Sequence, residues 1–200
     1  MKRFFLILII STMSFAVVGQ KNDSSLFHRG TFLFGGGLGT KSHLGNWGLT
    51  TNLFFTRNFN LKISAGGGQV NYNGGIASIG PEYFAQITHN KFILLGSVWA
   101  ITSDRYDVID DESSTRRTCQ TYSNQYIRTY AGIAFVKKPA VYKIEIGYSY
   151  ALYAPRYTLD GVWTASQTEQ VKNAMSSGLS VSLTIQGILS KHRKNNTQTQ

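Results

Sequence analysis

The sequence predicts an all-β protein, an eight-stranded antiparallel up-and-down transmembrane β-barrel that follows a cleaved signal peptide. Three observations lead to this prediction. The 200 residues include 20 glycines, only 3 prolines and 13% aromatic residues, a composition that suits long strands. After residue 19, apolar and polar residues alternate with a period of two in one segment after another. The longest polar connections between these segments all fall on one side of the expected sheet, as in bacterial outer-membrane barrels.

Residues 1–19 are predicted to be a secretory signal peptide. Lys2 and Arg3 precede an apolar run from Phe4 to Ile10, and small residues then suit a cleavage site before Gln20. The run is shorter than the ~20 residues that a membrane-spanning helix needs. We therefore expect a barrel domain over 20–190, followed by a basic polar tail over 191–200.

Eight segments have a length close to the ~9–11 residues that a tilted membrane strand requires. In chain order they are 31–40, 47–57, 60–70, 76–88, 91–102, 125–137, 140–153 and 178–189. Pro81 lies inside the fourth segment and predicts a bulge or a shorter strand, because proline cannot donate to the strand ladder. The fifth segment is apolar on both faces, so the sequence leaves its register open.

The other seven segments each have a face of large apolar residues. In chain order these include Phe32, Phe34 and Leu38; Leu49, Leu53 and Phe55; Leu61 and Ile63; Ile79, Tyr83 and Ile87; Ile127, Ile133 and Phe135; Tyr142, Ile144 and Ile146; and Leu179, Val181 and Leu183. The opposite faces are mostly Gly, Ser, Thr and Ala, which suit the narrow interior of eight strands. We expect the large residues to face lipid, with tyrosines near the strand ends as in aromatic girdles.

The connections predict the orientation. The segments 103–124 and 155–177 are long and polar, and both fall on the same side, whereas short turns join the strands on the other side. In outer-membrane barrels the short turns are periplasmic and the long loops face outside. We therefore expect an outer-membrane protein of a Gram-negative envelope, with both termini in the periplasm.

The small polar faces also carry charges. Lys62, Glu82, Arg128, Lys143 and Glu145 would share the interior of the barrel, where a buried charge is tolerated only when it is paired. We expect a network of salt bridges among these five residues that plugs the lumen. A gate or a proton path is the alternative interpretation of the same residues.

The chain resembles the small bacterial outer-membrane barrels of the OmpA-domain and OmpX type over roughly residues 30–189. The resemblance depends on the signal peptide, the eight amphipathic segments, the alternation of turns and loops, and the last strand, "SSGLSVSL". It implies insertion by barrel-assembly machinery that reads Gly178, Val181 and Leu183. One departure is the polar tail after Leu189, because such proteins often end on an aromatic residue in the last strand.

The net charge and the remaining motifs do not identify a catalytic activity. The net charge of +10 falls to +8 once Lys2 and Arg3 are removed, which favours outer-membrane lipid and lipopolysaccharide as partners and, after export, excludes nucleic acid. The sequence identifies no protein partner, cofactor or metal. An acidic surface loop comprises Asp104, Asp107, Asp110, Asp111 and Glu112, and its spacing does not match a calcium-binding EF-hand.

Two other functions stay open. Ser42 and His43 with an acid such as Asp104 or Asp107 would suit an outer-membrane lipid-modifying enzyme, although no catalytic residue is assigned. A soluble periplasmic lipocalin-like barrel would turn the large apolar faces inward around a ligand. The leading hypothesis is an outer-membrane barrel with a plugged lumen and a structural or surface-loop interaction role.

Overall fold

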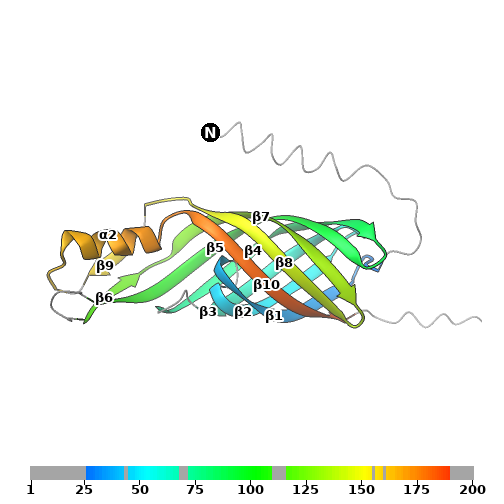
Figure 1. Ribbon diagram of the computed structural model, residues 1–200, viewed down its shortest axis with the longest axis horizontal. Coiled ribbons are helices and arrows are strands. Elements are labelled where there is room, and N and C mark those ends of the chain that lie inside the picture. The colour runs from blue at the N-terminus through cyan, green and yellow to red at the C-terminus, as the bar shows by residue number, and fades with distance from the viewer. Residues whose placement is uncertain are drawn as a thin grey trace, which may run out of the picture.

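The computed structural model describes residues 26–42, 45–67, 72–109, 116–154, 156–159 and 161–189. Its fold is a closed antiparallel β-barrel of eight strands, which confirms the predicted fold class (Figure 1). The barrel strands are β1 (Phe32–Ser42), β2 (Gly45–Phe54), β3 (Phe59–Gly67), β4 (Tyr72–Thr88), β5 (Lys91–Ile109), β7 (Asn124–Lys137), β8 (Ala140–Ala151) and β10 (Gly178–Leu189). Their order in the sheet is β4-β3-β2-β1-β10-β8-β7-β5, and pairing of β4 with β5 closes the barrel.

The two ends of the barrel differ. The short hairpins β2–β3, β4–β5 and β7–β8 all lie at one end of the barrel. The start of β1 and the end of β10 lie at the same end, since Phe32 pairs with both Leu53 of β2 and Leu189 of β10. We call this the turn end. The opposite end, the loop end, carries the long connections from β5 to β7 and from β8 to β10. The predicted asymmetry of the connections is therefore present.

The segment 103–124, expected to be a polar connection, is largely strand. β5 continues to Ile109, and β6 (Arg116–Thr121) pairs with its outer part, while β9 (Tyr157–Leu159) pairs with β6. We call this three-stranded extension of the barrel wall the flap (Figure 1). Its strands are mostly polar on both faces, so the alternation that marks the other strands is missing from its sequence.

The helix α2 (Ala165–Ala174) was also not expected. Thr164 and Gln167 form a capping box at its start, which supplies partners for backbone N–H groups of the first turn. Gln167 and Val171 of α2 and the C-cap residue Met175 are buried on one side of it. Val171 and Met175 share a cluster with Cys119 of β6, against which Leu159 of β9 packs. Two apolar residues on that side are too few to signal a helix by periodicity. Among the described residues, no helix is both long and apolar enough to cross a membrane.

Pro81 does not bulge its strand. The pairs Ile79–Trp99 and Glu82–Gly96 keep the same register on either side of it, and Pro81 itself pairs with Leu61. The irregularity in β4 lies between Gln86 and Thr88 instead. β4 therefore runs as one strand of 17 residues.

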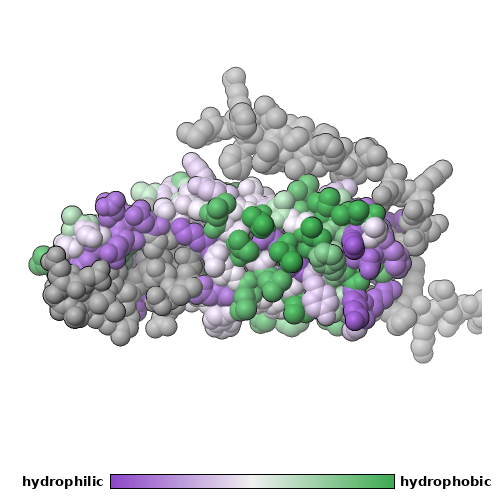
Figure 2. Space-filling view, in the orientation of Figure 1, coloured by the Kyte–Doolittle hydropathy of each residue, from purple (hydrophilic) through white to green (hydrophobic). Residues whose placement is uncertain are grey.

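The barrel is apolar outside and polar inside. Large hydrophobic side chains are exposed on every barrel strand, among them Leu38, Leu49, Ile63, Ile79, Leu95, Ile133, Ile146 and Leu183. Figure 2 shows hydrophobic residues gathered over the barrel strands and hydrophilic residues at both ends. A soluble barrel would bury these side chains. The arrangement contradicts the lipocalin-like alternative, which needs the apolar faces inside.

A cluster of apolar side chains lies inside the barrel near the turn end. Phe27, which precedes β1, stacks on Phe54 with ring centroids 4.7 Å apart and also contacts Phe84 and Phe92. Phe92 and Leu94 are inward residues of β5, whereas Ile93 and Leu95 face outward, which settles the register that the sequence left open. The aromatic rings form an apolar layer inside the turn end.

Candidate functional site: the polar interior of the barrel

Polar side chains from six strands meet inside the middle of the barrel. We call them the lumenal cluster: Asn52, Asn60, Lys62, Glu82, Tyr130, Lys143, Glu145, Ser182 and Gln186. Each occupies an inward position of the strand alternation, and all are at most 8% exposed. The strands bring residues far apart in sequence together because consecutive barrel strands enclose one narrow space.

Three ion pairs connect the four charged members of the cluster. Lys62 Nζ lies 2.6 Å from Glu145 Oε1 and 3.3 Å from Glu82 Oε1. Lys143 Nζ lies 2.9 Å from Glu82 Oε2. Two ammonium groups therefore face two carboxylates, and the charges of the cluster cancel. A balanced set is the condition under which buried charges are tolerated.

Glu82 receives hydrogen bonds from four other strands. Lys62 and Tyr130 donate to Oε1, and Asn52 and Lys143 donate to Oε2, at distances between 2.7 and 3.3 Å. These donors come from β3, β7, β2 and β8, so one carboxylate links walls on both sides of the lumen.

The neutral members extend the network. Ser182 Oγ donates to Glu145 Oε2 at 2.9 Å. Gln186 Nε2 and Lys143 Nζ both donate to Asn52 Oδ1, at 2.8 and 2.9 Å. Asn52 Nδ2 in turn donates to Asn60 Oδ1 at 2.6 Å. These hydrogen bonds satisfy polar groups that burial would otherwise leave without partners, a cost of about 1–3 kcal/mol each.

Glycines make the room that Tyr130 occupies. Gly96 of β5 and Gly147 of β8 are the cross-strand neighbours of Tyr130. A Cβ atom at Gly96 would overlap the Tyr130 ring. The ring can therefore lie across its neighbours, with its hydroxyl on Glu82 and its face 4.4 Å from Lys62 Nζ.

The structure brings together four of the five charged residues that the sequence assigned to the lumen. Arg128 lies one inward position nearer the loop end than Tyr130, where its Nε donates to Ser149 Oγ at 3.1 Å and its guanidinium donates to the carbonyl oxygen of Ser42. The neutral members of the cluster were not predicted as site residues. They occupy the same inward faces as the charged residues. The alternation of the strands therefore could have identified them, because it shows which polar residues point inward.

The structure describes only some of the other predicted site residues. Asp104 and Asp107 lie within strand β5 rather than in a loop, while Asp110, Asp111, Glu112 and His43 lie outside the described residues. Ser42 is buried, and its hydroxyl donates to the Gly45 carbonyl oxygen at 3.0 Å. Within the described part of the chain, no group of three or more His, Cys, Asp or Glu side chains could hold a metal ion.

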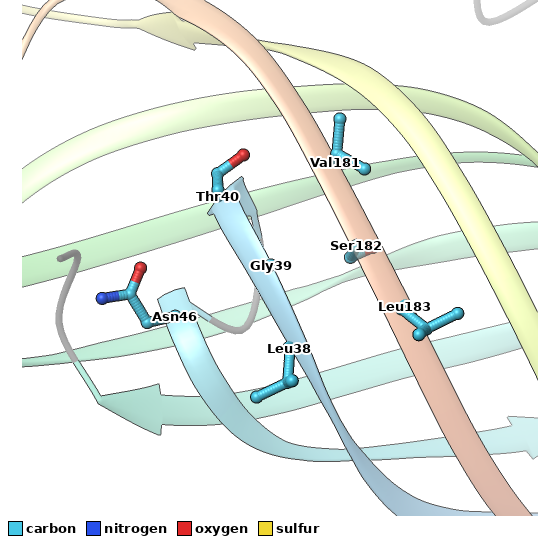
Figure 3. A pocket seen from close by; sticks show the side chains of 7 residues that line it. All are labelled: Leu38, Gly39, Thr40, Asn46, Val181, Ser182 and Leu183. Atoms are coloured by element: carbon cyan, nitrogen blue, oxygen red, sulfur yellow. The ribbon is translucent and has the colours of Figure 1, made fainter.

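A shallow hollow of about 410 Å³ lies on the outer wall over the seam between β1 and β10 (Figure 3). Its lining residues are Leu38, Gly39, Thr40, Asn46, Val181, Ser182 and Leu183. None of these side chains is acidic or basic, and the Ser182 hydroxyl is bonded to Glu145 in the interior. The hollow therefore holds no acid–base pair that catalysis would use.

Comparison with known proteins addresses only the fold. No family model and no curated protein sequence matches the chain. The N-terminal β-barrel domain of Pseudomonas aeruginosa OprF is similar in structure, with a TM-score of 0.52 and 12% identity over 81% of this chain and 98% of that one. Acinetobacter baumannii CarO matches at a TM-score of 0.36 and 13% identity, over 84% of this chain and 100% of that one; its shape is too different to support an argument. What the chain shares with the OprF domain is the fold, a small closed β-barrel.

Proposed function

We propose that the protein is an outer-membrane β-barrel whose turn end and termini face the periplasm and whose lumen is plugged. Its role is structural, or it presents the loop end to partners outside the cell. The observation that carries the proposal is the inverted barrel: apolar side chains outside, and a charge-balanced polar cluster inside.

Aromatic residues at two levels of the outer surface support the membrane setting. Phe59, Phe135 and Tyr142 are exposed near the turn end, and Trp99 and Tyr150 are exposed nearer the loop end. Tyr142 and Tyr150 are eight residues apart on β8, about 26 Å along a strand at ~3.3 Å per residue. A strand tilt of ~40° reduces this to about 20 Å, close to the ~25 Å apolar band between aromatic girdles.

The filled interior supports the plug. An aromatic layer from Phe27 to Phe92 lies inside the turn end, and the lumenal cluster lies above it. Eight strands leave just enough space for side chains, so a hydrated ion would have to displace both layers.

The loop end supports a surface role. The flap and α2 extend the barrel wall beyond its rim (Figure 1), and Val162 at 85% and Tyr153 at 65% are among the most exposed hydrophobic residues of the described chain. Exposed apolar side chains beyond the barrel rim suit contact with another molecule.

Planar bilayer recordings test the plug. We expect the folded protein to give no steady conductance. We expect conduction from a variant that combines serine at Lys62, Glu82, Lys143 and Glu145 with alanine at Phe27, Phe54, Phe84 and Phe92, because both layers are then opened. A variant with four outward serines at Leu49, Ile63, Ile133 and Ile144, checked for folding first, is the control. A large steady current through the unmodified protein would refute the plug.

A further inference from the structure

Among the described residues, the turn end carries an excess of positive charge. Five cationic side chains are exposed there: Arg29, Arg57, Lys91, Lys137 and Lys138. They lie before β1, in the β2–β3 hairpin, at the start of β5 and in the β7–β8 hairpin, and so are distributed around the barrel. We call them the cationic ring. Among the described residues at this end there is no Asp or Glu.

The loop end has no such excess. Its strands and connections contain six cations in the sequence, Lys41, Arg105, Arg116, Arg117, Arg156 and Lys172. In the sequence, the same segments contain seven acids: Asp104, Asp107 and Glu169, which the structure describes, and Asp110, Asp111, Glu112 and Asp160, which belong to connections outside the described residues. The end that would face lipopolysaccharide under the proposed orientation is therefore close to neutral, and attraction to lipopolysaccharide does not explain the charge of the chain.

The cationic ring lies next to the aromatic residues of the turn end. Arg57 follows Phe55 by two residues, and Lys137 follows Phe135 by two; both phenylalanines are exposed, at 47% and 39%. Phe135 and Lys137 lie in β7, where two residues of strand span about 7 Å. This matches the ~5–8 Å thickness of the headgroup region of one leaflet. With the aromatic rings at the edge of the hydrocarbon, the cations fall among the headgroups.

We propose that the cationic ring binds the headgroups of anionic phospholipids in the leaflet at the turn end. This rests on the proposed function, because it requires the barrel to span a membrane. Exposed Lys and Arg side chains at headgroup depth attract anionic lipid over neutral lipid, and a ring gives this preference to lipids on several sides of the barrel. Under the proposed orientation the leaflet is the periplasmic one.

Spin-labelled lipids test the proposal. The folded protein is reconstituted in phosphatidylcholine vesicles, and the motionally restricted signal of labelled phosphatidylglycerol is compared with that of labelled phosphatidylcholine. We expect an association constant about threefold or more higher for phosphatidylglycerol, reduced by 0.5 M salt because exposed charges are screened within ~4–5 Å at that ionic strength.

Two matched triple variants locate the effect. K91Q/K137Q/K138Q removes three ring cations, and we expect it to lose the preference for phosphatidylglycerol. R105Q/R156Q/K172Q removes three exposed loop-end cations and should retain the preference. Both variants are checked for folding by the difference in gel mobility between boiled and unboiled samples.

Four other outcomes would contradict the ring proposal, and one of them would also contradict the proposed function. Equal association of the two lipids with an inserted, folded barrel overturns the ring proposal and leaves the proposed function intact. Loss of preference in both variants also overturns it.

Binding to peptidoglycan is measured by cosedimentation. If the protein shows no lipid preference, and the unmodified protein cosediments with purified peptidoglycan while the ring variant does not, the ring proposal is overturned and the ring binds the cell wall instead. A protein that alkaline carbonate extracts from the vesicles overturns the proposed function and the ring proposal together.

Discussion

The carboxylate of Glu82 is the most connected charge in the interior. It is 1% exposed and accepts hydrogen bonds from Asn52, Lys62, Tyr130 and Lys143. Removal of one partner from a buried ion pair leaves the other charge without compensation, which costs more than the pair contributes. The stability of the barrel should therefore be sensitive to this one side chain.

We expect Glu82→Ala to lower the free energy of unfolding by about 3–5 kcal/mol. Urea unfolding in phospholipid vesicles, followed by gel mobility, measures it. Glu169→Ala removes an exposed carboxylate from α2 and should leave the unfolding midpoint unchanged. Equal midpoints for Glu82→Ala and the unmodified protein would show that the cluster does not hold the strands together.

Gly96 provides a second residue-level prediction. Gly96→Ala places a methyl group where the Tyr130 ring lies, and overpacking of this kind costs about 1–3 kcal/mol. Gly75→Ala is the matched control, because the nearest atom to its new Cβ is 3.9 Å away. The same urea titration compares the two, and a stable Gly96→Ala protein would mean that Tyr130 moves aside without loss.

At the residue scale, the sequence predicted which charges face inward but not which ones meet. Lys62, Glu82, Lys143 and Glu145 could be assigned because each interrupts an otherwise small and neutral face. The separation of Arg128 from their contacts depends on the stagger between β7 and β8, where Arg128 pairs with Ser149 and Tyr130 with Gly147. Alternation along a strand carries no information about that stagger.

At the element scale, the flap depends on α2 to bury its inner face. Cys119 of β6 is wholly buried in the cluster that contains Val171 and Met175. The residues that follow α2 are also held to the barrel, since Tyr126 donates to the carbonyl oxygen of Met175 at 3.0 Å and Lys41 to that of Ser176 at 3.3 Å. The helix should therefore protect the thiol.

We expect Val171→Asp to raise the rate at which maleimide labels Cys119 at least tenfold, because a buried carboxylate would detach α2 from the flap. Cys119 is the one cysteine of the chain, so labelling reports this site alone. Asn173→Asp adds the same charge on the exposed face of α2 and should label slowly. Rapid labelling of the unmodified protein would contradict the packing.

The barrel strands could be predicted and the flap could not, for one physical reason. Each barrel strand separates two environments, so its sequence alternates, as in Tyr142 to Glu145. β6 has Arg, Thr and Gln around a single Cys, and its strand state depends on pairing with β5 and β9. Long-range pairing of this kind leaves no local pattern. Pro81 was expected to bulge or shorten its strand. Instead β4 keeps its register past Pro81, and only the ladder to β5 is interrupted between the pairs Ile79–Trp99 and Glu82–Gly96.

At the scale of the whole molecule, the inverted distribution of side chains is the central observation. Leu49 and Ile146 are more than half exposed, while Lys62 and Lys143 are fully buried. The hydrophobic effect opposes this arrangement in water, and lipid removes the opposition. Closure of the sheet by the pairing of β4 with β5 also removes the unpaired edges that lipid could not satisfy.

The most direct test of this account is a gel of purified outer membranes in SDS, with and without boiling. A closed barrel with an apolar outer wall should resist the detergent, so we predict a faster unboiled band that is confined to the membrane fraction. A protein in the soluble periplasmic fraction that shows no shift on boiling would contradict the membrane-spanning barrel.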